Sequence, residues 1–254
     1  MSELDGQVAL VTGAGAGLGQ AIAEEMSRAG AAVAAVDIDE DAARDTAQRI
    51  EAAGGTSRVY VADVSDRAQV DSTWDGVAGE FGRLDIVVNN AGVSFVGPHI
   101  VDTTDEVWHR SIGVMQHGVF YGMRAAARHM LPQGSGSVVT ISSIRGLTSN
   151  PGRIAYCAAK AAVIMMTRVA ASEWGPFGVR ANAIAPGVQR TPMWEDDAAK
   201  GVVDDNVVRV VPAGRLGEPI EVGRLAVFLC SPDAAYINGA CVTIDGGLTT
   251  VPVG

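Results

Sequence analysis

Aromatic residues and cysteines are scarce in this chain of 254 residues. Phe, Trp and Tyr make up 5% of the sequence, whereas hydrophobic residues as a whole make up 48%. Ala, Val, Ile and Leu must therefore pack most of the core, which suits a parallel sheet buried on both faces. The three cysteines, Cys157, Cys230 and Cys241, are odd in number and lack metal-type spacing, which indicates a reducing cytoplasm.

Positive charge is also in short supply. The chain carries 19 Lys and Arg against 29 Asp and Glu, a formal net charge of -10. This balance argues against a nucleic-acid or anionic-membrane partner. The acidic start has no basic region before an apolar stretch, and no uninterrupted apolar run approaches the length of a membrane span. We therefore expect a cytoplasmic protein with no membrane partner, and the scattered His and Cys residues predict no metal site.

No Pro/Gly/Ser-rich linker, repeat or low-complexity tract divides the chain, so we expect one domain over residues 1–254. Short aliphatic runs alternate with helix-length segments, which predicts a doubly wound, seven-stranded parallel α/β sheet with helices on both faces. Proline, an acidic cluster at Glu195–Asp197 and two short apolar pieces together indicate a mobile substrate lid at about 188–211. The expected strands are Gln7–Thr12, Ala32–Val36, Arg58–Val61, Leu84–Asn89, Ser137–Ser142, Val179–Ile184 and Cys241–Ile244.

A glycine-rich turn, Thr12–Gly19, directly follows the first expected strand and opens a helix that runs to about Ala29. Glycines there allow backbone N–H groups to approach a pyrophosphate at a helix N-terminus, although a glycine-rich turn can also be only a tight connection. Asp37 closes the second strand, where a carboxylate can bind the ribose hydroxyls of NAD and would repel the 2′-phosphate of NADP. Ala16 and Ile38, where a basic residue might receive that phosphate, are uncharged. The sequence therefore favours NAD.

A second motif, Tyr156-x-x-x-Lys160, has acid–base character. In a helix the two side chains project from the same face, one turn apart. A tyrosine has an ordinary pKa of about 10, and a nearby ammonium group favours its phenolate. Ser143 could hold a substrate oxygen alongside them. The alternatives are a plain strand-end hydroxyl for Ser143 and a solvated helix lysine for Lys160.

With these motifs in order, the chain resembles the single-domain, NAD-dependent branch of the short-chain dehydrogenase/reductase family over essentially its whole length. Asp63-Val64 matches the pair that contacts adenine, and Asn89–Gly92 matches the motif at the end of the fourth strand. Asn182, Pro186-Gly187 and Thr191 match the segment beneath the nicotinamide, and Asp245–Gly247 matches the C-terminal signature. The resemblance implies a Rossmann fold whose cofactor-binding residues are Gly13, Ala16, Gly17, Leu18, Asp37, Ile38, Asp63, Val64, Asn90, Tyr156, Lys160, Pro186, Gly187, Val188, Thr191 and Met193.

The resemblance also implies a reaction, the interconversion of a small-molecule secondary alcohol and its ketone by hydride transfer. Tyr156 would act as general acid/base, Ser143 would hold the substrate oxygen, and Lys160 would bind the nicotinamide ribose and lower the pKa of Tyr156. Val188 and Thr191 would fix the carboxamide and phosphates. The expected substrate-side residues are Ser94, Ser143, Arg145, Arg153, Gln189 and Trp194, and His99 and His117 could line the entrance.

One position departs from the family pattern. Reading Trp108 to Gly118 against the family's fourth catalytic residue, an asparagine, places Met115 there. Methionine cannot hydrogen-bond the water through which Lys160 would exchange protons. One hypothesis is that a backbone carbonyl near Met115, or Gln116, keeps this relay at reduced efficiency. The other is that Met115 only fills a gap in the core.

Two further functions stay open at this stage. A 3-oxoacyl-thioester reductase uses the same scaffold, although Asp37 counts against the NADPH that biosynthetic reduction usually draws on. A non-catalytic NAD-binding regulatory protein is favoured only by Met115.

The expected helices Thr103–Leu131 and Ile154–Trp174 are more apolar than one buried stripe requires, and family members commonly pair such helices, so we expect a homotetramer. Thr103 and Glu106 have the spacing of a capping box before Val107–Leu131.

Overall fold

A computed structural model describes residues 3–95, 99–199 and 207–250 of the chain. Seven strands form one sheet with the order β3-β2-β1-β4-β5-β6-β7, and every pairing is parallel. The prediction of a doubly wound, seven-stranded parallel sheet is therefore confirmed. The strands are β1 (Val8–Thr12), β2 (Ala32–Asp37), β3 (Ser57–Val61), β4 (Ile86–Asn89), β5 (Gly136–Ile141), β6 (Val179–Pro186) and β7 (Cys241–Ile244).

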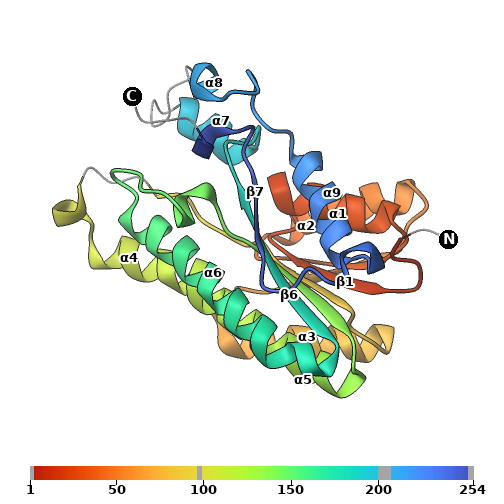
Figure 1. Cartoon of the computed structure of the whole chain (residues 1–254). Helices are drawn as coiled ribbons and strands as arrows, with labels where there is room; N and C mark the ends of the chain where they lie inside the picture. The colour runs from red at the N-terminus through yellow and green to blue at the C-terminus, as the bar shows by residue number, and fades with distance from the viewer. Residues whose placement is uncertain (1–2, 96–98, 200–206, 251–254) are drawn as a thin grey trace.

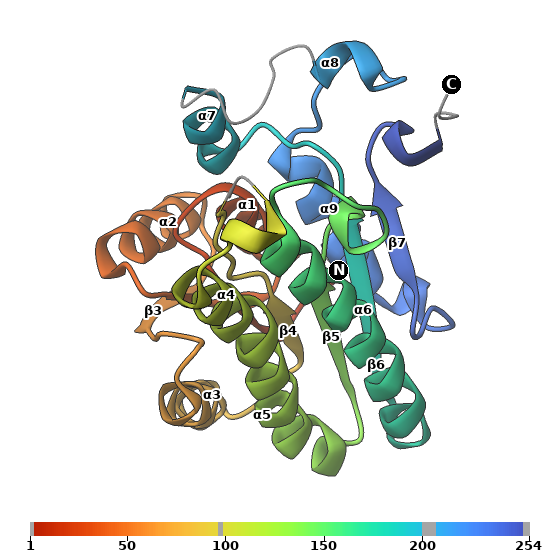
Figure 2. The ribbon, with the colours of Figure 1, turned by 90° about the vertical axis from the view of Figure 1, so that its left-hand side faces the viewer.

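Helices cover both faces of the sheet (Figures 1 and 2). Successive strand residues point to opposite faces, so Leu10 packs under one helix layer while Ala9 and Val11 pack under the other. One layer holds α3 (Arg67–Phe81), α4 (Asp105–Ile112), α5 (Gly118–Gln133) and α6 (Ile154–Trp174), and the other holds α1 (Gly17–Arg28), α2 (Glu40–Ala52) and α9 (Pro219–Cys230). The short helices α7 (Pro192–Ala199) and α8 (Val207–Val210) lie beyond the carboxyl ends of the strands (Figure 1).

The helix expected over Val107–Leu131 differs from its prediction in two ways. Thr104, and not Thr103, caps α4, because the Thr104 side chain accepts a hydrogen bond from the Val107 N–H at 3.3 Å. Thr103 instead ends a short 3₁₀ turn, and its hydroxyl donates to the His99 carbonyl at 3.3 Å. The helix is also interrupted by a π-helical turn over Gly113–His117 that separates α4 from α5. Such turns are rare and occur frequently at functional sites.

The α6 helix is the most apolar long element among the described residues. By length and composition alone, Ile154–Phe177 could cross a membrane, although Lys160, Arg168 and Glu173 interrupt its apolar residues. One side of α6, which includes Ala159, Val163 and Ala170, is buried against the sheet and its neighbouring helices. We interpret α6 as a core helix of this domain because this side is buried. A core helix can meet the same criterion of length and apolarity as a membrane span.

Candidate active site

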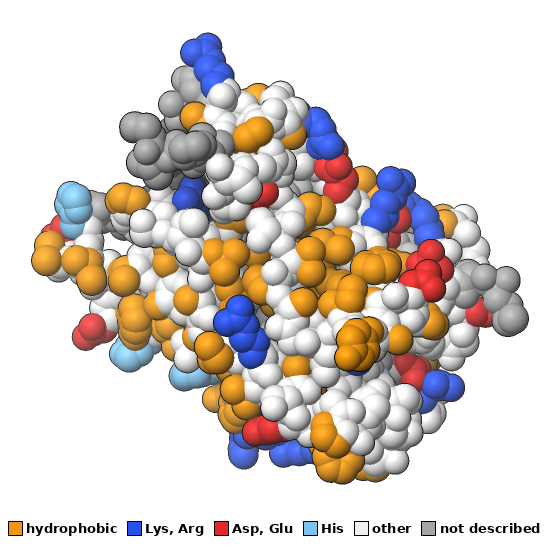
Figure 3. Space-filling view, in the orientation of Figure 1, with side chains coloured by type: hydrophobic (Ala, Val, Ile, Leu, Met, Phe, Trp, Pro, Cys, Tyr) orange, Lys and Arg blue, Asp and Glu red, His pale blue; other side chains and the backbone are white. Residues whose placement is uncertain are grey.

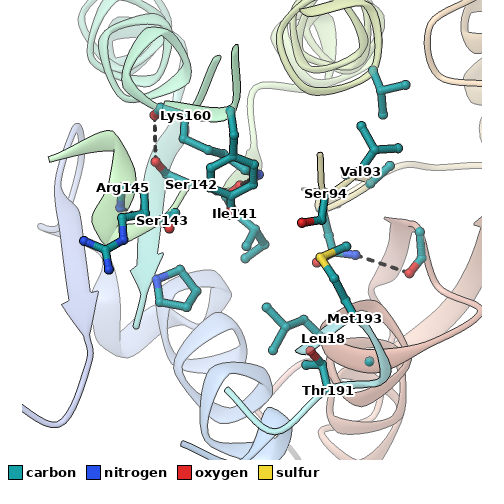
Figure 4. A pocket seen from close by; sticks show the side chains of 18 of the residues that line it. Leu18, Val93, Ser94, Ile141, Ser142, Ser143, Arg145, Lys160, Thr191 and Met193 are labelled. Atoms are coloured by element: carbon teal, nitrogen blue, oxygen red, sulfur yellow. Dashed lines mark hydrogen bonds between the residues drawn. The ribbon is translucent and has the colours of Figure 1, made fainter. Parts of the chain in front are cut away.

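A cleft with a volume of about 1180 Å³ opens at the carboxyl ends of the strands, beneath α7. Parallel α/β sheets place ligands at this edge because the loops that follow the strands converge there. All the residues that we assigned to catalysis, cofactor or substrate from the sequence line this one cleft. Figure 4 shows Ser143 and Lys160 on one side of the cleft, with Leu18, Ser94 and Met193 opposite. This placement brings the predicted residues together, while their individual roles stay predictions.

The glycine turn between β1 and α1 packs more closely than side chains would allow. Gly13 and Gly17 have φ angles of 65° and 57°, in the left-handed region that favours glycine. A Cβ atom on Gly19 would lie only 1.8 Å from the Gly13 carbonyl oxygen. Ala16, at the start of α1, provides no side-chain cap for the first N–H groups of the helix. This cradle therefore fits a pyrophosphate group, whose oxygens can accept those hydrogen bonds.

Asn90 and Thr12 hold this turn in place through hydrogen bonds. The Asn90 side-chain amide donates to the carbonyl oxygens of Thr12 and Gly13, at 2.9 and 3.2 Å. The Thr12 hydroxyl accepts hydrogen bonds from the backbone N–H groups of Asn90 and Ala91, at 3.0 and 3.1 Å. Asn90 borders the cleft as predicted, but its side chain is engaged in holding the turn. This bracing role was not apparent from the sequence motif.

Asp37 is held in place at the end of β2. One carboxylate oxygen accepts from the Gly15 N–H at 2.8 Å, and the other accepts from the Asp39 N–H at 3.0 Å. An ionised carboxylate has about four acceptor positions, so Asp37 retains capacity for ribose hydroxyls. Among the described cleft residues between Gly13 and Ser65, none is Lys or Arg. The residues present therefore fit the adenosine ribose of NAD.

Ser143, Tyr156 and Lys160 converge at the other end of the cleft. Ser143 follows β5, whereas Tyr156 and Lys160 lie one turn apart near the start of α6. The Lys160 Nζ atom lies 5.8 Å from the centre of the Tyr156 ring and donates a hydrogen bond to the Ile141 carbonyl at 2.7 Å. The Ser143 hydroxyl accepts a hydrogen bond from the Arg145 N–H at 3.1 Å. The three side chains thus share one environment, as their spacing predicted.

Burial dominates the electrostatics of this group. Burial raises the pKa of Tyr156 above its ordinary value, although a hydrogen bond with Ser143 and the charges of Arg153 and Arg145 act in the opposite direction. Burial also lowers the pKa of Lys160 to about 8. Lys160 is not among the groups that shift this pKa, so the expectation that Lys160 lowers the pKa of Tyr156 stays a prediction. Desolvation of the phenolate outweighs the nearby cations, and the ammonium group is directed at Ile141.

Three polar side chains from separate segments meet on the substrate side of the cleft, and we call them the Ser94–Arg153–Asp197 cluster. Arg153 donates to the Ser94 hydroxyl at 2.9 Å and to the Asp197 carboxylate at 3.0 Å. Ser94 donates to the same Asp197 oxygen at 3.1 Å. The Arg153 and Asp197 side chains are only 12% and 16% exposed. Asp197 was apparent in the sequence only as part of an acidic cluster, so its place in the site was missed.

The three other predicted substrate-side residues, and the predicted cofactor-binding residue Met193, have mixed environments. Gln189 is 7% exposed, and its amide donates to the Ile244 carbonyl at 3.3 Å while its Oε1 atom has no partner among the described residues. Arg145 donates to the Ser149 carbonyl at 3.2 Å, so it holds the loop after Ser143. Met193 and Trp194, on α7, form an apolar part of the wall.

Some residues that the sequence offered for the site lie outside the cleft. His99 and His117 are exposed and do not line the cleft, whereas His109 and Arg110 on α4 do. No signal in the sequence distinguishes these pairs, because the difference depends on how α4 packs. Asn182 is buried in the middle of β6. Its side-chain amide donates a hydrogen bond to the Ile237 carbonyl at 2.8 Å and accepts one from the Ala240 N–H at 3.0 Å. It therefore supports the connection to β7 and does not reach the cleft.

Met115 lies at the centre of the π-helical turn and is 1% exposed. It packs in a small apolar cluster with Ile112 and Ala159, against the partly buried Tyr156 ring. The side chain thus fills space beside Tyr156. This packing agrees with the gap-filling interpretation and leaves the proton-relay hypothesis open, since the π-helical turn disturbs the regular hydrogen bonding of the helix at the same place.

Comparisons with known proteins cover nearly the whole chain. A family model described as enoyl-(acyl carrier protein) reductase matches residues 13–249. D-threitol dehydrogenase of Mycolicibacterium smegmatis is 40% identical over 246 residues, which cover 97% of this chain and 94% of that protein. A 3-oxoacyl-(acyl-carrier-protein) reductase of Thermotoga maritima is 37% identical over 245 residues, covering 96% and 98%. The crystal structure of a gluconate 5-dehydrogenase from Burkholderia cenocepacia, in complex with NADP and tartrate, is 34% identical, with a TM-score of 0.93 and 98% of each chain covered.

Proposed function

Because the chain belongs to the short-chain dehydrogenase/reductase family of oxidoreductases, we propose that it interconverts a secondary alcohol and its ketone, with NAD as the cofactor. The observation that carries this proposal is the convergence of Ser143, Tyr156 and Lys160 in the same cleft as the glycine turn and Asp37. An acid–base group and a dinucleotide cradle in one cavity are what a hydride-transfer enzyme requires.

The residues divide the chemistry between them. The nicotinamide cofactor, when bound, supplies the hydride acceptor for oxidation and the hydride donor for reduction. Tyr156 takes the proton from the substrate hydroxyl in oxidation and returns it in reduction. Ser143 donates a hydrogen bond to the same substrate oxygen and fixes its position. Lys160 binds ribose hydroxyls and, while protonated, adds positive charge beside the phenol.

The preference for NAD is supported by the Asp37 carboxylate and by the absence of Lys and Arg among the described cleft residues from Gly13 to Ser65. A 2′-phosphate would meet this carboxylate with no basic partner on the same side. The related gluconate 5-dehydrogenase structure contains NADP, so family membership alone does not decide the cofactor. Titration of the protein with NADH and with NADPH, followed by cofactor fluorescence, tests the preference, and tighter binding of NADPH would contradict it.

A 3-oxoacyl-thioester reductase is the second candidate, and the related Thermotoga maritima reductase favours it. Asp37 opposes it, because a biosynthetic reductase usually uses NADPH. Reduction of an acetoacetyl thioester with NADH and NADPH separates the two candidates. Oxidation of secondary alcohols with NAD, in the absence of thioester reduction, supports the first.

A non-catalytic NAD-binding protein is the remaining alternative. The Tyr156→Phe variant tests it, because the substitution removes the hydroxyl and keeps the ring. We expect NADH binding to persist and alcohol oxidation to fall by about a thousandfold or more, in the range of lost general acid–base catalysis. Native activity in this variant would reject the role of Tyr156.

We also propose an oligomeric state and a cellular location for this protein. Hydrophobic side chains gather on the molecular face of Figure 3 that presents α6 and β7. Met165 and Val169 on α6 are 56% and 49% exposed, and Phe120 on α5 is 47% exposed. Covering these side chains with further copies of the chain would remove apolar surface from water, which supports the proposal of a homo-oligomer, a homotetramer. The cytoplasmic location is proposed from the cysteine content of the sequence. Light scattering tests the tetramer, and a monomer at micromolar concentration would exclude it.

A further inference from the structure

We propose that the Ser94–Arg153–Asp197 cluster recognises a second hydroxyl group on the substrate, next to the reacting carbon. The substrate is then a neutral vicinal diol or polyol, or the corresponding hydroxyketone. This inference rests on the proposed alcohol–ketone reaction and narrows its substrate class.

The cluster lies within reach of the reacting position. Arg153 immediately precedes α6 and stands three residues before Tyr156. Ser94 lies across the cleft from Ser143 and Lys160 (Figure 4). We infer that a substrate whose oxygen is held between Ser143 and Tyr156 extends across the cleft toward Ser94 and its partner Arg153. The charge of Arg153 already acts on the Tyr156 hydroxyl in the protein alone, which agrees with this proximity.

The chemistry of the cluster matches a hydroxyl group. A hydroxyl both donates and accepts hydrogen bonds, and the cluster offers both complements: a carboxylate that accepts and a guanidinium that donates. The Asp197 bonds with Ser94 and Arg153 both fall on one carboxylate oxygen, Oδ2. The second Asp197 oxygen can accept a hydrogen bond from a substrate hydroxyl, and the remaining guanidinium N–H groups of Arg153 can donate one.

The charges favour a neutral substrate over a carboxylate. Asp197 already neutralises Arg153, and both side chains are largely buried. A substrate carboxylate at Arg153 would face the like charge of Asp197, or would have to displace it and leave a buried carboxylate unpaired, which is strongly unfavourable. A simple apolar alcohol would gain no hydrogen bond from these three polar groups beyond the bond of its reacting hydroxyl.

The test compares three alcohols with the same number of carbons: secondary butanol, vicinal butanediol and β-hydroxybutyrate. Their oxidation with NAD is followed by absorbance of the reduced cofactor. We expect kcat/KM for the diol to exceed that for butanol by about ten- to a hundredfold, the range for hydrogen bonds to charged groups. The hydroxy acid is expected to be the poorest of the three, because its carboxylate meets Asp197.

Asp197→Asn removes the charge and keeps the size of the side chain. We expect the diol-to-butanol ratio of kcat/KM to fall by about tenfold. Glu195→Gln is the matched control, because it removes a negative charge from the exposed side of the same helix and should leave the ratio intact. A second readout is independent of turnover: the diol should raise the Tm of the NADH complex of the wild type more than butanol does, and Asp197→Asn should abolish this difference.

Four results would overturn the inference. The diol and butanol could be used and bound equally well. The hydroxy acid could be the best substrate and improve further in Asp197→Asn, which would make Arg153 a carboxylate-binding residue. Asp197→Asn could slow all three alcohols equally, which would limit the cluster to positioning α7. Glu195→Gln could lower the ratio as much as Asp197→Asn. In each case, oxidation that still depends on the Tyr156 hydroxyl would show that the proposed reaction stands while the substrate class is wrong.

Discussion

The Lys160 ammonium nitrogen lies 5.8 Å from the centre of the Tyr156 ring, yet its hydrogen bond goes to the Ile141 carbonyl at 2.7 Å. The lysine is thus buried beside the phenol without bonding its oxygen. Burial raises the pKa of Tyr156 and lowers that of Lys160, because desolvation penalises the charged form of each group. Tyr156 and Lys160 are therefore both shifted toward their neutral forms in the protein alone.

The rate of alcohol oxidation should rise with pH, and the rate of ketone reduction should fall. Oxidation requires the Tyr156 phenolate, whose pKa is raised, so the reactive fraction increases with pH through the neutral range. Reduction requires the protonated phenol and is favoured at lower pH. Profiles of kcat/KM for both directions between pH 6 and 10 check this, and an oxidation rate that declines from neutral pH upward would contradict it.

Lys160→Met should stabilise the protein at neutral pH while abolishing efficient catalysis. The pKa of Lys160 is lowered from 10.5 to about 8, so the unfolded state binds more protons between these values. The free energy of unfolding of the wild type should therefore rise with pH across this window, by up to about 3 kcal/mol. Below pH 8 Lys160 is charged, and burying this charge lowers the free energy of unfolding of the wild type. Methionine carries no charge, so the variant avoids this cost. Urea denaturation at pH 7 and pH 9.5 measures both effects, and a wild-type stability that falls over this window would refute the assignment.

Asp37→Asn should weaken the preference for NADH over NADPH by about tenfold, because a neutral amide no longer repels a 2′-phosphate. The amide oxygen can still accept from the Gly15 N–H, so the turn should keep its shape. Asp39→Asn is the control, since Asp39 caps α2 through the Ala42 N–H at 3.1 Å and does not line the cleft. Fluorescence titrations with both cofactors provide the comparison, and an unchanged ratio in Asp37→Asn would remove Asp37 from cofactor selection.

Gly19→Ala should destabilise the protein by about 3 kcal/mol or more and abolish NADH binding. The new Cβ atom would overlap the Gly13 carbonyl, because the two would lie only 1.8 Å apart. Gly79→Ala in α3 is the matched control, since nothing lies within 4 Å of a Cβ atom there. That substitution should stabilise α3 by about 0.5–1 kcal/mol. Thermal denaturation and NADH titration of the two variants distinguish close packing at Gly19 from a general effect of alanine.

Met115→Asn should increase turnover, with the largest gain at low pH, if proton exchange through Lys160 limits the reaction. The asparagine amide could bind a relay water that the methionine cannot. A stability loss of about 1–3 kcal/mol is expected from placing an amide in the apolar cluster with Ile112 and Ala159. Met115→Leu keeps the apolar packing and serves as the control. Equal turnover of the asparagine variant and the wild type across pH would contradict the proton-relay hypothesis and support only the gap-filling interpretation.

Short-range patterns were sufficient to predict much of the site. Tyr156 and Lys160 were paired by the helical repeat alone, and the turn at Gly13–Gly19 was recognised because backbone geometry there requires glycine. Asp37 was assigned from its place at the end of a strand. The expected bounds of α6 and β7 agree with the structure for the same reason, since both are long or strongly apolar segments with clear local signals.

The tertiary structure decided what depends on distant segments and on burial. Ser94, Arg153 and Asp197 meet although they are 59 and 44 residues apart along the chain. The upward shift of the Tyr156 pKa is set by burial, which no local motif encodes. Asn182 matched a cofactor motif but is used inside the protein. Local sequence thus determined which residue types stand at the ends of the strands, whereas the packing of separate segments determined their partners and the energy of charging them.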